Sequence, residues 1–123
     1  MANDLTCKVA SSTMYLTVPK LKQRAINQQL TRLTELCGGV TEHDARGAWC
    51  DPSGAWCVED VIQYEWRVFG INPQLATAIT LHMDCVEALL NTGERAVMAG
   101  NKLYSRRIAC AQSWQGTNFT QGE

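Results

Sequence analysis

A repeated tetrapeptide is the feature that most constrains the fold of this chain. Gly-Ala-Trp-Cys occurs at residues 47–50 and again at 54–57, and Asp51-Pro52-Ser53 lies between the two copies. Asp, Pro and Gly suit the first, second and fourth positions of a type I turn, so we predict a turn over 51–54 inside a β-hairpin. This turn would place Cys50 opposite Ala55 and Trp49 opposite Trp56, with both indoles facing the core.

The expected register divides the two hairpin strands, about Val40 to Cys50 and Ala55 to Phe69, into two faces. One face is apolar apart from Asp60 and carries Trp49, Trp56, Val58, Ile62, Tyr64, Trp66 and Val68. The opposite face combines charged residues with Cys50, Cys57 and Val61. Arg46 is expected opposite Glu59, and His43 is expected to face inward opposite Ile62. Cys50 and Cys57 would share the outer face, where two free thiols are favoured over a redox link.

Composition excludes several classes of protein. The 123 residues suit a single domain, and a formal charge of -1 gives no general attraction to nucleic acid, so extended nucleic-acid binding is not expected. There is no apolar run of membrane-spanning length and no signal-like N-terminus, which predicts no membrane partner and a cytoplasmic location. The six cysteines are then expected to be reduced. They form no Cys-x-x-Cys pair, so neither a metal nor another cofactor is expected.

The remaining segments alternate between strand and helix patterns. We predict a strand from Met14 to Val18 and a helix from Pro19 to the Gly38-Gly39 pair. A second helix is expected from about Pro73 to Leu90. Two short strands, 95–99 and 103–109, would follow around a Gly100 turn. The order β-α-β-β-α-β predicts an α+β, ferredoxin-like sandwich with two helices on one face of an antiparallel sheet, and an extra C-terminal strand is an option. This single domain would cover 1–111, with a polar tail at 112–123.

The second predicted helix is apolar over most of its circumference. A helix of this kind must be buried on more than one side, which in a small domain favours self-association. The expected interface therefore combines this helix with the outer face of the hairpin. Its residues are Ala78, Leu81, Cys85, Ala88, Leu89, Cys50, Cys57 and Val61.

Chemistry is signalled weakly, because no catalytic motif with a known mechanism is present. The best candidate for anion binding is a basic group around the last strand, in which arginine and lysine would contact phosphate and tyrosine would stack on a base. Its residues are Lys102, Tyr104, Arg106 and Arg107. Alternation along a strand puts only one of the two arginines on the surface shared by Lys102 and Tyr104, which favours a pocket across a subunit interface. Asp60, His43 and His82 are the candidate acid-base residues of an alternative, enzymatic function.

The segment 39–49, Gly-Val-Thr-Glu-His-Asp-Ala-Arg-Gly-Ala-Trp, with Asp51 to Gly54 after it, resembles a pattern of small, uncharacterised ferredoxin-like proteins of bacteria and their phages. The resemblance implies the fold and a phage or mobile-element source, but no catalytic residues. The favoured function is a non-enzymatic, homo-oligomeric binding protein, an accessory or counter-defence factor that sequesters a small phosphorylated, nucleotide-like ligand or a host protein. The alternatives are a small enzyme with a site between subunits and a structural or assembly protein.

Overall fold

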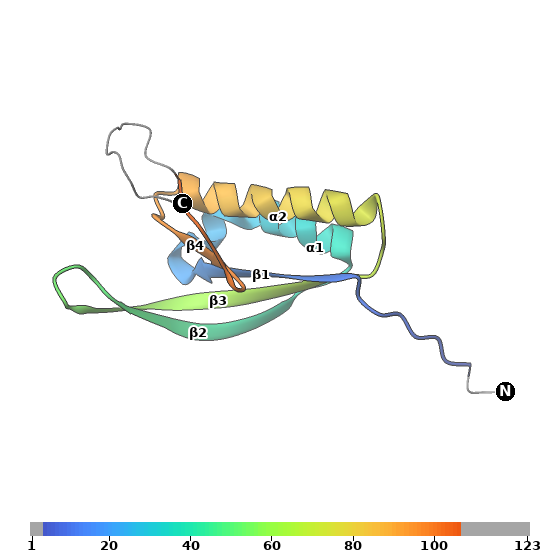
Figure 1. The fold of residues 1–123 in the computed structure, drawn as a ribbon, viewed down its shortest axis with the longest axis horizontal. Coiled ribbons are helices and arrows are strands. Elements are labelled where there is room, and N and C mark those ends of the chain that lie inside the picture. Colours follow the sequence, from blue (N-terminus) through green and yellow to red (C-terminus); the bar gives the residue numbers. More distant parts are fainter. Residues whose placement is uncertain (1–3, 107–123) are drawn as a thin grey trace.

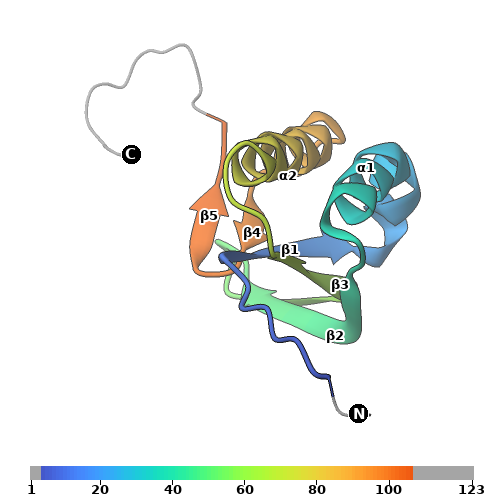
Figure 2. The same cartoon turned by 90° about the vertical axis from the view of Figure 1, so that its right-hand side faces the viewer.

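Three long strands form the central antiparallel sheet, in the order β1-β3-β2. The computed structural model describes residues 4–106, and in it the strands are β1 (Ser12–Pro19), β2 (Thr41–Cys50) and β3 (Trp56–Val68). The helices lie on one face of this sheet (Figures 1 and 2). They are the 3-10 helix η1 (Lys20–Ile26) with α1 (Asn27–Cys37), and α2 (Gln74–Asn91). The predicted mixed α+β class is confirmed.

A short hairpin follows α2. Its strands β4 (Val97–Ala99) and β5 (Lys102–Tyr104) form a separate two-stranded sheet. β4 contacts β1, which is an edge strand of the three-stranded sheet. The predicted first helix is divided into η1 and α1 at Ile26, whose side chain is fully buried and whose backbone (φ -115°, ψ 14°) interrupts the helix.

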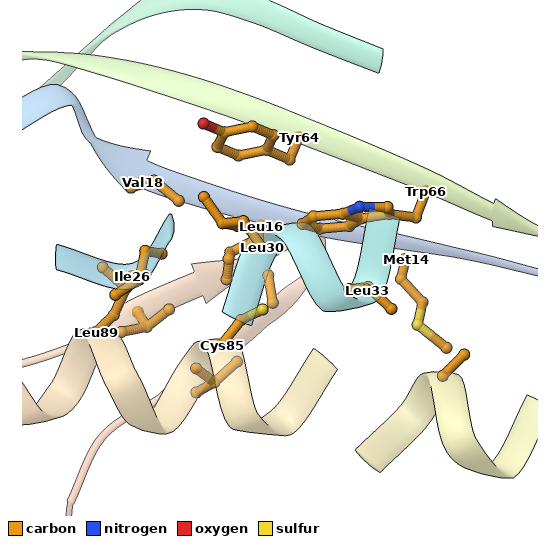
Figure 3. Packing of buried hydrophobic residues seen from close by; sticks show 14 of the residues in the cluster. Met14, Leu16, Val18, Ile26, Leu30, Leu33, Tyr64, Trp66, Cys85 and Leu89 are labelled. Atoms are coloured by element: carbon orange, nitrogen blue, oxygen red, sulfur yellow. The ribbon is translucent and has the colours of Figure 1, made fainter. Parts of the chain in front are cut away.

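The core lies between the sheet and the helices, and Trp66 of β3 is at its centre (Figure 3). The Trp66 side chain is fully buried, and its ring stacks on that of Tyr64 with centroids 5.6 Å apart. Its indole Nε1 donates a hydrogen bond to Thr34 Oγ1 of α1 at 2.9 Å, so the polar atom of the indole is satisfied. The alternation predicted for β3 is therefore correct: Tyr64, Trp66 and Val68 face the helices and are buried.

The hairpin turn forms where the sequence predicts it, but the strand register differs by one residue. Gly54 N donates to Asp51 O at 2.9 Å, as a turn over 51–54 requires. Gly54 has φ +89°, and this left-handed residue lengthens the loop to three residues, so that Asp51 N bonds to Ala55 O. Cys50 consequently pairs with Trp56, and Trp49 pairs with Cys57.

The shift reverses the two faces of β2 relative to β3. Cys50 and Cys57 lie on opposite faces, contrary to the prediction. Arg46 stands opposite Asp60 instead of Glu59, and His43 stands opposite Gln63 on the outer face instead of facing inward.

The tip of this hairpin is not part of the core. β1 pairs with β3 only as far as Val61, and the β2–β3 hairpin continues beyond β1 and the helices as a projecting arm (Figure 1). Trp49 and Trp56 are 46% and 73% exposed. Asp60, which lies on the face predicted to be apolar, is exposed for the same reason.

The apolar residues predicted to form an interface on α2 are largely used within the chain. Ala78, Cys85 and Leu89 are fully buried against the sheet and α1, and Leu81 and Ala88 are partly buried against the same core. The wide apolar surface of α2 is thus covered by α1, β1 and β4, and it does not by itself require a second subunit. Burial also raises the pKa of the Cys85 thiol to about 12, which keeps this cysteine protonated and inert.

Several predictions concern residues outside the described part of the chain: Arg107, strand residues 107–109 and the tail 112–123. No helix within residues 4–106 has the length and apolar character needed to cross a bilayer.

The packing of α1 leads to a stability prediction. Leu33 is fully buried under the sheet, whereas Leu21 of η1 is 96% exposed. Leu33→Ala is expected to lower the free energy of unfolding by about 2–5 kcal/mol, because it leaves a cavity in the core. Leu21→Ala, the same chemical change at an exposed site, should alter it by less than about 0.5 kcal/mol. Urea denaturation followed by tryptophan fluorescence measures both, and equal effects would contradict the described core.

Candidate functional site

The face of the sheet opposite the helices carries two rows of polar side chains. Tyr15 of β1 pairs with Glu65 of β3, which pairs with Thr41 of β2. In the next row, Thr17 pairs with Gln63, which pairs with His43. Directly opposed residues of antiparallel strands point to the same face, so these six side chains lie together on the outer surface. Alternation along β3 sends Tyr64 and Trp66 inward and leaves this surface polar.

A cavity of about 240 Å³ opens at this surface. The β4–β5 hairpin, which carries Met98 and Gly100, forms its rim on the β1 side. Gly100 has φ +68°, and a Cβ at this position would approach Tyr15 Cδ2 to 3.1 Å. The turn therefore needs glycine both for its backbone angle and for close contact with the Tyr15 ring. The complete lining is Tyr15, Leu16, Thr17, His43, Gln63, Tyr64, Glu65, Met98 and Gly100.

The cavity has a negative charge and an aromatic ring. Glu65 is largely covered and forms an ion pair with Arg67, its neighbour on the same face of β3. No lysine or arginine is among the residues that line the cavity. Tyr15 is 45% exposed, so one part of its ring contacts the hairpin and another is accessible. The site thus offers a stacking surface, a carboxylate, an amide and an imidazole within one small space.

His82 has a structural role behind this site. Its Nε2 lies 2.7 Å from the backbone oxygen of Tyr15, and because a carbonyl only accepts, Nε2 must donate. Its ring also meets Trp66 edge-on, with centroids 6.2 Å apart. His82 therefore joins α2 to the backbone of β1 at the residue whose side chain lines the cavity. It is not among the lining residues itself.

The basic group predicted from the last strand does not form a pocket in the described residues. Lys102 is exposed, and Tyr104 packs partly against the core. Arg106 donates from Nη2 to Asn91 Oδ1 at the end of α2. None of the three lines the cavity on the outer face. Their role in ligand binding stays a prediction, as do the interface roles of Cys50, Cys57 and Val61, of which Val61 is already buried.

A second, larger space of about 420 Å³ lies between α1 and α2. Its charged lining residues Arg32, Asp84 and Glu87 are exposed and carry both signs. Gln29 Oε1 is the one buried side-chain oxygen or nitrogen without a hydrogen-bond partner in residues 4–106. We favour the outer-face cavity as the functional site because it combines an aromatic ring with converging polar groups, as ligand sites usually do.

The sequence interpretation missed Tyr15, Gln63 and Glu65 as a group. The alternation of β1 and β3 indicates their common face, but the one-residue error in the β2 register placed His43 on the other side. The sequence predicts a turn at Gly100, but it does not indicate that this turn contacts the Tyr15 ring. In the described range, no three His, Cys, Asp or Glu side chains come together as metal ligands.

Substitution of Gly100 tests the rim of the cavity. Gly100→Ala is expected to lower stability by about 1 kcal/mol, because alanine disfavours a left-handed backbone, and to displace the Tyr15 ring. Gly54→Ala is the matched control: its φ is also positive, but a Cβ there meets nothing within 4 Å. NMR signals of the Tyr15 ring should shift in the first variant and stay unchanged in the second. An unshifted Tyr15 in Gly100→Ala would contradict the close contact.

Comparison with known proteins gives a structural neighbour but no family. No protein-family model matches the chain, and no curated protein matches it in sequence. The structure is similar to that of a phage SAM lyase in complex with S-methyl-5'-thioadenosine, with a TM-score of 0.57 and 10% sequence identity. The similarity covers 89% of this chain and 100% of the other. At this level of identity, the similarity shows that the two chains share a fold.

Proposed function

We propose that this chain is a small-molecule-binding accessory protein of a phage or related mobile element, and that it binds a nucleoside-like ligand on the outer face of its sheet. The observation that carries the proposal is the cavity in which Tyr15, Gln63, Glu65 and His43 converge. The structural neighbour, a phage protein with a bound thioadenosine, supports both the ligand class and the source. Sequestering such a ligand would suit a counter-defence factor.

The lining groups match the parts of a nucleoside. The accessible part of the Tyr15 ring offers a surface for base stacking. The Glu65 carboxylate accepts hydrogen bonds from ribose hydroxyl groups, and the Gln63 amide both donates and accepts. His43 adds an imidazole, in which one ring nitrogen can donate and the other can accept.

The charges favour a nucleoside without phosphate. The lining contains no lysine or arginine that would bind a phosphate group, and Arg67, the arginine beside Glu65, is already paired with that carboxylate. This refines the ligand expected from the sequence. A phosphorylated ligand would have to use Lys102, Tyr104, Arg106 and Arg107 instead, of which the first three lie outside this cavity.

The volume of the cavity favours self-association. At about 240 Å³ it is smaller than the roughly 300 Å³ at which pockets for drug-sized ligands begin. A base or a ribose would fill it, and the rest of the ligand would lie on an open sheet. We infer that the functional unit is a homo-oligomer in which another subunit limits this face, and that β4 beside β1 gives each subunit a ferredoxin-like arrangement.

Titration with nucleosides tests the proposal. Calorimetry with S-methyl-5'-thioadenosine and adenosine should show saturable binding, and adenosine monophosphate should bind more weakly. Tyr15→Ala is expected to weaken binding about 5-fold to 150-fold, because base stacking on an aromatic ring contributes about 1–3 kcal/mol. Glu65→Gln should also weaken binding of the ribose-containing ligands.

Two controls make the result specific. Tyr15→Phe keeps the ring and should bind almost as the wild type does, and Glu35→Gln removes a carboxylate from the exposed surface of α1 and should have no effect. Saturable binding that survives Tyr15→Ala but is lost in Lys102→Ala or Arg106→Ala would transfer the site to the basic strand. No binding of any nucleoside at millimolar concentration would overturn the proposal.

An enzyme is the second candidate, because His43 and Glu65, two groups able to exchange protons, line the same cavity, and the structural neighbour is a lyase. Incubation with S-adenosylmethionine, followed by chromatography for released S-methyl-5'-thioadenosine, distinguishes the two functions. Turnover abolished by His43→Ala in a folded protein would favour the enzyme. Binding without turnover would favour the accessory protein.

A further inference from the structure

β2 is a long strand whose outer edge is unpaired in the described part of the chain. It spans ten residues, Thr41–Cys50, and β3 is its one neighbour in the sheet. Figure 2 shows β2 as the outermost strand, away from the β4–β5 hairpin at the other side of the sheet. An exposed edge of this length presents a row of backbone donors and acceptors that other strands can bind.

The direction of the free backbone groups follows from the hairpin. Asp51 N bonds to Ala55 O on β3, and the register continues without a bulge from Cys50 to Thr41. Hydrogen bonding in an antiparallel pair alternates from residue to residue. The N–H and C=O groups of the even-numbered residues, Glu42, Asp44, Arg46 and Ala48, therefore point to the free edge.

Charged residues on an edge strand usually prevent pairing, because they bring like charges together or must be buried. The charges of β2 are ordered differently. Asp44 and Arg46 flank Ala45, the residue near the middle of the strand. If two copies pair in antiparallel fashion about a twofold axis at Ala45, Asp44 of each copy stands opposite Arg46 of the other.

We propose that β2 is the self-association edge of this protein, and that two copies pair through it in this register to form a continuous six-stranded sheet. The interface is isologous, as in most homodimers. Pairing at this edge extends the sheet and leaves its outer face open, so it is a second contact beside the one that limits the cavity in the proposed function.

Two features of the strand support this register. It overlaps the whole of Thr41 to Trp49 with its copy, so that hydrogen bonding uses nearly the entire strand. It also brings no like charges together, because Glu42 stands opposite Ala48. Registers centred on Asp44 or on Arg46 would place two aspartates or two arginines directly opposite each other. Within one chain, Asp44 forms an ion pair with Lys20 at 3.4 Å. This pair is exposed to solvent and contributes little to stability.

Complementary charge reversals test the proposal. Asp44→Arg gives a strand with two arginines, and Arg46→Asp gives a strand with two aspartates. Each variant alone is expected to raise the dissociation constant of the dimer about tenfold or more, because both ion pairs become repulsive. Mixed together, the two variants should form a heterodimer, since every arginine then faces an aspartate. Native mass spectrometry resolves the heterodimer from either homodimer by mass.

The controls separate this interface from other causes. Glu87→Arg makes a similar reversal on the exposed surface of α2 and should leave the dimer unchanged. Circular dichroism checks that each variant folds, and recovery of the heterodimer shows independently that the two single variants retain the strand. A wild-type protein that is monomeric at about 50 μM, or variants that self-associate as the wild type does, would overturn the proposal. Nucleoside titration of the monomeric variants is a separate measurement, so loss of dimer with retained binding leaves the proposed function standing.

Discussion

The alternation of side chains along β3 is the constraint on which the rest of the structure depends. Tyr64 and Trp66 point toward the helices and form the centre of the core, where the indole also bonds to Thr34. Gln63 and Glu65 alternate with these two residues along the strand, so their side chains must point to the opposite face. Packing on one side of β3 thus fixes the position of the polar groups on the other.

The sequence was sufficient to predict the elements but not every pairing between them. Alternation in β1 and β3, and Pro and Gly at the ends of elements, correctly indicated three sheet strands, two helical segments and a final hairpin. The turn at Asp51 to Gly54 was also correct. The predicted register was wrong because Gly54 is compatible with two loops. It can end a two-residue loop, or it can adopt a left-handed conformation that lengthens the loop by one residue. Only the positive φ of Gly54 separates these two cases, and composition does not encode it.

Coverage by the helices explains why the burial of several residues differs from the prediction. The apolar circumference of α2 was interpreted as a subunit interface, yet Ala78, Cys85 and Leu89 are buried within the chain. In contrast, Trp56 and Asp60 lie on the same side of β3 as the core residues but are exposed, because no helix reaches this part of the hairpin. Periodicity identifies the face of a strand, whereas the length of the covering helices decides where that face is buried. How far the helices cover the sheet depends on tertiary structure.

The register set at Gly54 links the ligand site to the strand edge. With the two-residue loop, His43 would stand opposite Ile62 and face the helices, and the cavity would lose one of its four polar groups. The same change would turn the free backbone groups of Asp44 and Arg46 toward β3. The three-residue loop instead directs His43 to the outer face and directs the edge hydrogen bonds at Asp44 and Arg46 outward. The Asp51 carboxylate supports this loop by accepting hydrogen bonds from the hydroxyl and backbone N–H of Ser53 and from Ala55 N, and these bonds hold the pKa of Asp51 below its usual range. A single turn therefore determines which face of β2 meets a ligand and which backbone groups can meet a second copy.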